Sequence, residues 1–88
     1  MRVAQVIGTT TATVKDARLT GATLLVVNFV DGKGKVLDAA HVAVDTCGAG
    51  VGDTVLIAQG GAARLPAALA GAPVDAAIIA IIDQITLS

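Results

Sequence analysis

Apolar and polar positions at the start of the chain follow the pattern of a β-strand. In residues 2–15 the apolar positions alternate with other residues, Gln5 among them, and a series of β-branched threonines follows, which favours an extended backbone. Alternation with a period of two places successive side chains on opposite faces of a strand. We therefore predict one long strand over residues 2–15, bent at Gly8, because glycine within a strand often marks a bend.

The middle of the chain predicts a β-hairpin. Residues 22–30 (ATLLVVNFV) are too apolar for a strand with one face in water, which indicates burial on both faces. An Asp-Gly pair and a second glycine follow in residues 31–35 (DGKGK), and glycine supplies positive φ in a tight turn at no steric cost. Residues 36–45 (VLDAAHVAVD) are then the return strand.

Two further strands and a short helix are expected in the second half of the chain. Residues 53–59 (DTVLIAQ) and 74–87 (VDAAIIAIIDQITL) are rich in β-branched and apolar residues, as strands are. Between them, Pro66 can open a helix and Gly71 can end it, so a short alanine-rich helix is predicted near residues 67–70.

The predicted architecture is all-β: a small five-stranded Greek-key barrel of the OB type with one short helix, formed as a single domain by residues 1–88. A domain of this size is only marginally stable on its own core. Hydrophobic residues make up 55% of the chain, more aliphatic side chains than a lone barrel can enclose. Because the single cysteine, Cys47, excludes an intrachain disulfide, we expect association with other subunits.

Charge and hydropathy argue against two common kinds of partner. The net charge is −1, and the six basic residues are scattered among seven aspartates, so no basic patch for nucleic acid is visible. No apolar run approaches the ~20 residues of a membrane-spanning helix, and polar residues interrupt the N-terminal stretch, unlike a signal peptide. We expect a reducing, cytoplasmic setting, with neither nucleic acid nor a membrane as partner.

A glycine-rich stretch over residues 45–57 (DTCGAGVGDTVLI) raises the question of nucleotide binding, since Gly48, Gly50 and Gly52 stand at alternate positions. A phosphate-binding loop must lead into a helix, whose N-terminus holds the anion. This stretch leads into a strand and lacks the lysine of a P-loop. It is therefore interpreted as a tight turn with close backbone packing, with positive φ expected at Gly50.

Residue types that carry catalysis are scarce. The chain has no glutamate, tyrosine or tryptophan, and its only serine is Ser88, so a Ser/His/Asp triad has no credible nucleophile. Along an extended segment Cys47 and His41 would lie about 20 Å apart unless the chain reverses, against the ~3 Å that a nucleophile and its base require. His41 is expected at the surface or in an interface. No catalytic residue, metal ligand or cofactor is predicted.

Four aspartates lie at the edges of apolar runs, where hydrogen bonding in turns and caps is the usual role. They are Asp45, Asp53, Asp75 and Asp83.

An OB-type module that binds a small ligand or an oligonucleotide is the alternative interpretation. Such sites use aromatic platforms beside basic residues, and the only aromatic residue here, Phe29, lies within an apolar run and is expected to be buried. The last strand is more informative, because AIIAII (residues 77–82) is apolar on both faces. A covering helix could bury the outer face, but the only predicted helix is short. We therefore expect Ile79 and Ile81 in a subunit interface.

Five stretches of the sequence carry a family resemblance: MRVAQVIGTTTATVK, GATLLVV, DTCGAGVGDTVLI, GGAAR and PVDAAIIAIID, which together span nearly the whole chain. They resemble the bacterial microcompartment vertex proteins, the pentameric shell proteins of carboxysomes and of ethanolamine- and propanediol-type metabolosomes. The resemblance implies a five-stranded barrel that assembles about a fivefold axis and fills the corners of a polyhedral shell in the bacterial cytoplasm. It also implies a structural protein without a reaction of its own, with the hexameric shell proteins of the same microcompartment as partners.

The resemblance implies roles for the glycine-rich stretch. Gly48, Ala49, Gly50, Val51 and Gly52 are similar to the family's glycine loop. This loop is expected near the fivefold axis or between subunits, with its backbones closely packed around a narrow pore.

Three charged residues also match the family's motifs. Arg64 matches the arginine after the fourth strand and is expected in subunit or shell contacts. Asp75 and Asp83 match the acids of the PVDA and IID motifs, and are expected to form hydrogen bonds at turns and between chains. Gly61 and Ala62 stand where relatives commonly have serines, so hydroxyl hydrogen bonds are not expected there.

Overall fold

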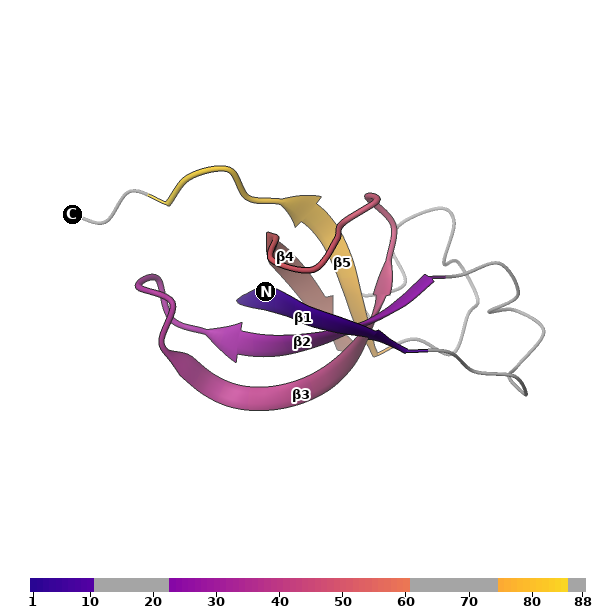
Figure 1. Cartoon of the computed structure of the whole chain (residues 1–88), viewed down its shortest axis with the longest axis horizontal. Coiled ribbons are helices and arrows are strands. Elements are labelled where there is room, and N and C mark those ends of the chain that lie inside the picture. The colour runs from indigo at the N-terminus through magenta and orange to yellow at the C-terminus, as the bar shows by residue number, and fades with distance from the viewer. Residues whose placement is uncertain (11–22, 61–74, 86–88) are drawn as a thin grey trace.

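The computed structural model describes residues 1–10, 23–60 and 75–85, which form a closed five-stranded barrel (Figure 1). Its strands are β1 (Arg2–Thr10), β2 (Thr23–Val30), β3 (Val36–Asp45), β4 (Thr54–Gln59) and β5 (Ala76–Ile81). Around the barrel they follow the order β1-β2-β3-β5-β4, and β4 pairs with β1 again. All neighbours are antiparallel except β3 and β5, which are parallel.

This topology confirms the predicted all-β Greek-key barrel, and each of the five predicted strands is present. The part of the chain that the structure describes contains no membrane-spanning helix. The short helix expected near residues 67–70 lies outside the described residues, as do residues 11–15 of the first predicted strand.

The barrel encloses one hydrophobic core, built mainly from alternate positions of the strands because every second side chain points inward. Its buried members are Ala4, Val6, Leu25, Val27, Phe29, Ala43, Val55, Ile57 and Ile78. In β2 the other face is only half-buried at Leu24, Val26 and Asn28, so the expected burial on both faces is partial.

Phe29, the only aromatic residue, is fully buried in the core, and two polar side chains lie close to its ring. The guanidinium carbon of Arg2 lies 4.0 Å from the centre of the ring, a cation–π arrangement. The imidazole of His41 lies 4.8 Å from it at an angle of 58°. His41 is half-buried, with 41% of its side chain exposed.

A bulge interrupts β1 at the predicted bend. The pairing of β1 with β2 shifts register between Val6 and Gly8, which leaves Ile7 as the extra residue. The side chain of Ile7 is exposed. The register shift therefore lies at the glycine where a bend was predicted.

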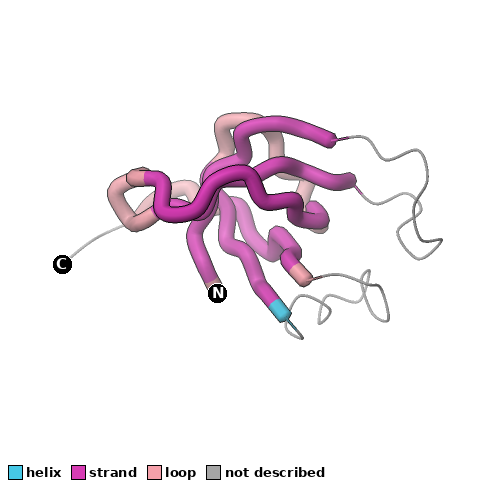
Figure 2. The backbone as a smooth tube through the Cα atoms, turned by 90° about the horizontal axis from the view of Figure 1, so that it is seen from below, coloured by secondary structure: helices cyan, strands magenta, loops and turns pink. Residues whose placement is uncertain are grey.

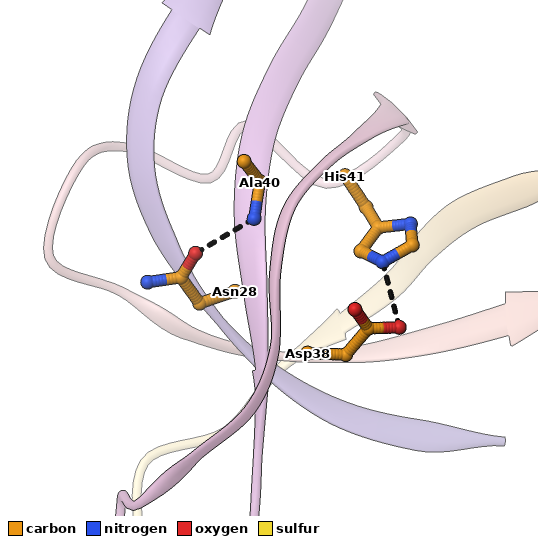
Figure 3. A network of polar contacts seen from close by, with 4 residues as sticks. All are labelled: Asn28, Asp38, Ala40 and His41. Carbon is orange, nitrogen blue, oxygen red and sulfur yellow. Dashed lines mark hydrogen bonds and ion pairs between the residues drawn. The ribbon is translucent and has the colours of Figure 1, made fainter.

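A second irregularity shapes β3 opposite Asn28 (Figure 3). Ala40 has a φ of 59°, a left-handed conformation that costs a non-glycine residue roughly 1–2 kcal/mol. Its N–H donates a hydrogen bond of 2.9 Å to the Oδ1 atom of Asn28, which takes the place of a backbone partner. Nearby, the Nε2 atom of His41 lies 2.8 Å from a carboxylate oxygen of Asp38.

Figures 1 and 2 give two perpendicular views of the barrel. Both place the turn between β2 and β3 and the segment that follows β5 at the same end of the molecule. In Figure 1, β3 curves along the lower side of the barrel, and near its end it pairs with β5 at Val44 and Asp45.

Candidate functional site

The glycine-rich loop between β3 and β4, residues 46–53, is fixed where it leaves β3. An Asp45 carboxylate oxygen accepts a hydrogen bond of 2.9 Å from the N–H of Cys47. The hydroxyl of Thr46 donates a bond of 2.6 Å to the backbone carbonyl of Ile78 in β5. The start of the loop is therefore hydrogen-bonded both to the end of β3 and to β5.

The end of the loop is bonded to β1. The N–H of Gly52 donates to the carbonyl of Val6 at 2.9 Å, and the N–H of Val6 donates to the carbonyl of Asp53 at 3.0 Å. A carboxylate oxygen of Asp53 accepts from the N–H of Gly50 at 2.8 Å. Because both ends are held by hydrogen bonds, the loop forms part of the barrel wall. The turn bonding expected of Asp45 and Asp53 is confirmed.

Positive φ occurs at the two outer glycines of the loop rather than the central one. Gly48 has a φ of 77° and Gly52 a φ of 96°, whereas Gly50 does not adopt a left-handed conformation. The expectation of positive φ at Gly50 is therefore wrong. The N–H of Asp53 donates to the carbonyl of Gly50 at 3.0 Å, which closes a four-residue turn. Gly52 is the third residue of that turn, the position at which a type II turn requires positive φ.

The two residues that stand between the glycines of the loop, Ala49 and Val51, differ in burial. Ala49 is partly buried and packs against the core cluster. Val51 is 65% exposed, although it is a β-branched aliphatic residue. The loop is thus anchored inward through Ala49 and presents an apolar side chain to the exterior at Val51.

The isoleucines of the last strand divide between the core and the surface. Ile78 is fully buried, Ile79 is half-buried and Ile81 is 40% exposed. The strand is therefore apolar on more than one face, as expected. That Ile79 and Ile81 lie in a subunit interface stays a prediction.

The described charged residues that match the family motifs, Asp75 and Asp83, take no part in the hydrogen bonds of the loop. Asp75 is exposed, and its backbone carbonyl accepts from the N–H of Gly60 at 2.9 Å. Asp83 is exposed at the end of the barrel, after β5. Neither carboxylate is hydrogen-bonded to another residue of the described ranges. Arg64, like Gly61 and Ala62, lies outside those ranges.

The described residues contain no group of three His, Cys or Asp side chains that could hold a metal ion. An open hollow lies between the β2–β3 turn, β1 and Ile85. The one ionisable residue in its described lining is Asp31, whose carboxylate already accepts bonds from the N–H groups of Lys33 and Lys35 at 2.8 and 2.9 Å. The hollow therefore offers little to a charged ligand.

The structure reveals one surface feature that sequence reasoning missed. The first half of β3 is exposed at every position from Val36 to Ala40, and the side chains of Leu37 and Val42 are 59% and 54% exposed. The sequence indicates this exposure in one way: both faces of the return strand carry apolar or small residues, and no neighbouring helix is predicted to cover them.

Known proteins match this chain over almost its full length. Residues 1–83 match the family model described as "Ethanolamine utilisation protein EutN/carboxysome". The chain is 46% identical over 87 residues to the carboxysome shell vertex protein CcmL of Synechococcus elongatus, covering 99% of this chain and 88% of that protein.

Solved structures share the fold as well as the sequence. The barrel is similar to CcmL of Nostoc, with a TM-score of 0.91, 45% identity, and coverage of 97% of this chain and 92% of that one. It is also similar to the GrpN pentameric microcompartment shell protein of Rhodospirillum rubrum, with a TM-score of 0.90, 35% identity and full coverage of both chains.

Proposed function

Because the chain belongs to the EutN/carboxysome family, we propose that it is a shell vertex protein: a homopentamer that fills the fivefold corners of a polyhedral microcompartment in the bacterial cytoplasm. One observation carries this proposal. The barrel matches a pentameric microcompartment shell protein over the full length of both compared chains, with a TM-score of 0.90.

The role is geometric. Hexagonal subunits tile a flat sheet, and closing such a sheet into a polyhedron requires fivefold units at its corners. A vertex protein therefore works through its contacts with copies of itself and with hexameric shell proteins. It needs shaped surfaces and a rigid core, and no catalytic group.

We assign the glycine loop, residues 48–52, to the region near the axis or between subunits. The hydrogen bonds to β1 and β5 hold this loop rigid, and Val51 gives it an exposed apolar side chain. A fixed loop of this kind suits a contact that repeats five times. Arg64, Asp75 and Asp83 are assigned to polar contacts around the same interfaces.

An OB-type module that binds a small ligand or an oligonucleotide receives less support. Nucleic-acid sites of these barrels stack bases on exposed aromatic side chains. The only aromatic ring here is fully buried beneath Arg2 and His41, so it offers no stacking surface. The vertex role is therefore the conclusion that we retain.

The proposal is tested by producing the hexameric shell proteins of the same microcompartment with and without this chain, and examining the particles by electron microscopy. With the chain present, we expect closed polyhedral particles that contain it. Without it, we expect open sheets or tubes, because sixfold units alone do not close. Identical closed particles in both preparations, or particles that exclude the chain, would contradict the proposal.

A further inference from the structure

The first half of β3, residues 36–40, pairs with the end of β2 but has no buried face. Every one of its five positions is exposed. In most strands burial fixes the register, because a slip by one residue would move every core side chain to the outer face. Residues 36–40 have no core side chain to lose in such a slip. Burial therefore does not fix the register of this half of β3 against β2.

A bulge interrupts the pairing at the inner end of this exposed half. Opposite the single residue Asn28, β3 places two residues, Ala39 and Ala40. The extra residue is accommodated because Ala40 takes a φ of 59°, a left-handed conformation that is unfavourable for alanine. A regular pairing, with one residue of β3 opposite Asn28, would release that strain.

Two side-chain contacts exist only because of the bulge (Figure 3). The Oδ1 atom of Asn28 accepts a hydrogen bond of 2.9 Å from the N–H of Ala40. Asp38 and His41 are three positions apart, and in a regular strand residues at that spacing point to opposite faces. Here a carboxylate oxygen of Asp38 nevertheless lies 2.8 Å from the Nε2 atom of His41. Regular pairing would break both contacts.

The cost of the bulge and the contacts that favour it are of similar size. A hydrogen bond stabilises a fold by about as much as the left-handed conformation of one alanine costs. The side chains of Asp38 and His41 are 52% and 41% exposed, and a contact between such exposed groups adds little. The bulged and the regular register therefore lie close in free energy.

The turn before β3 can take up the residue that a regular pairing would release. Residues 31–35 contain two glycines, and Gly34 already has a φ of 88°. Lengthening such a turn by one residue costs little loop entropy. A slip by one residue is therefore compatible with the connection between β2 and β3.

We propose that the exposed half of β3 has two registers against β2, and that Asn28 is the latch that holds it in the bulged one. In the regular register this half shifts by one position, so that Val30 faces Leu37 rather than its present partner, Val36. The shift moves Leu37 and Asp38 to the faces opposite those that they now occupy. The latch thus decides which face of the hairpin is apolar and which carries the charge. The inference concerns the single barrel and does not depend on the proposed ring.

A cross-strand disulfide reads the register directly. In a Cys47→Ser background, Val30→Cys is combined either with Val36→Cys, its partner in the bulged register, or with Leu37→Cys, its partner in the regular one. Each protein is brought to equilibrium in a glutathione redox buffer. With Asn28 in place, we expect the 30–36 disulfide to dominate. Asn28→Leu removes the acceptor and is expected to raise the ratio of the 30–37 to the 30–36 disulfide by roughly 2- to 12-fold, the weight of one net hydrogen bond.

The sequence makes the disulfide easy to detect. Trypsin cleaves after Lys33 and Lys35, so the two introduced cysteines stay together in one mass only when a disulfide joins them. A denaturing gel without reductant separates disulfides within one chain from those between chains, and only the former are counted.

Two further variants separate a latch from a general loosening of the hairpin. Ala40→Gly removes the cost of the left-handed conformation, so adding it to Asn28→Leu is expected to return the ratio toward that of the parent. Asn28→Asp retains an oxygen acceptor and is expected to behave as the parent does. Circular dichroism verifies the fold, and Asn28→Ala replaces Asn28→Leu if that variant is unfolded.

Three results would overturn the latch. The first is a ratio of the two disulfides that Asn28→Leu leaves unchanged. The second is an equal rise of both disulfides in that variant, which would indicate loosening without a change of register. The third is a ratio that Ala40→Gly raises further, because glycine would then be acting through added flexibility and not through relief of strain.

Discussion

Replacing Phe29 with alanine is expected to lower the free energy of unfolding by about 3–5 kcal/mol, the usual cost of removing a buried phenylalanine. Phe29 is the largest of the fully buried side chains in the described barrel. Its loss removes the ring against which Arg2 and His41 lie and leaves a cavity within the aliphatic core cluster. A chain of this size has a total stability of roughly 4–13 kcal/mol, so the loss removes from about a quarter to all of it.

Urea unfolding followed by circular dichroism measures this loss. Because association stabilises the folded state, all variants are compared at one protein concentration. Phe29→Leu is the matched control, since it retains most of the buried volume and should lose clearly less stability. A Phe29→Ala protein whose unfolding free energy lay within 1 kcal/mol of the wild type would contradict the central place of this ring in the core.

Replacing Gly52 with valine is expected to destabilise the protein by about 2 kcal/mol. The φ of Gly52 is 96°, a conformation that a β-branched residue adopts only under strain, and such strain costs of order 1–3 kcal/mol. The strained residue also donates its N–H to Val6, so relaxation of the turn would weaken the bond between the loop and β1. The same urea titration measures the loss.

Gly50→Ala is the matched control in the same loop. An added Cβ at Gly50 would lie 4.0 Å from a carboxylate oxygen of Asp53, an ordinary van der Waals distance, and φ there is not left-handed. We expect a change within about 0.5 kcal/mol. Equal losses of unfolding free energy from Gly50→Ala and Gly52→Val would contradict the claim that the positive φ of Gly52 causes the loss.

The strands were predictable because each depends on local periodicity and turn chemistry. The alternation in β1, the hairpin glycines before β3 and the isoleucines of β5 each indicate a strand without reference to the rest of the chain. Turn bonding by Asp45 and Asp53 was predictable for the same reason, since each bond spans only two or three residues.

The conformations of single residues were not predictable in this way, because they follow from particular hydrogen bonds. Positive φ belongs to Gly52 rather than Gly50 because the turn closes between Gly50 and Asp53, which the spacing of the glycines alone does not reveal. Ala40 adopts positive φ because Asn28, twelve residues earlier, accepts its N–H. No property of alanine favours that conformation.

The exposure of the first half of β3 depends on how that strand meets β5, which lies more than thirty residues later in the sequence. The sequence of the strand is typical of a return strand covered on both sides. Among the described residues, β5 pairs with β3 at only two positions, Val44 and Asp45. Whether a strand pairs along its whole length is decided by the path of a segment more than thirty residues away, and periodicity carries no information about it.

The mass of the purified protein in native mass spectrometry tests the central claim, that this barrel is the subunit of a fivefold ring, most directly. We predict a dominant species of five chains, each of 8.6 kDa, that persists on dilution well below the concentration used for purification. A protein that remains a single chain, or that forms a ring of any other number, would contradict the vertex role.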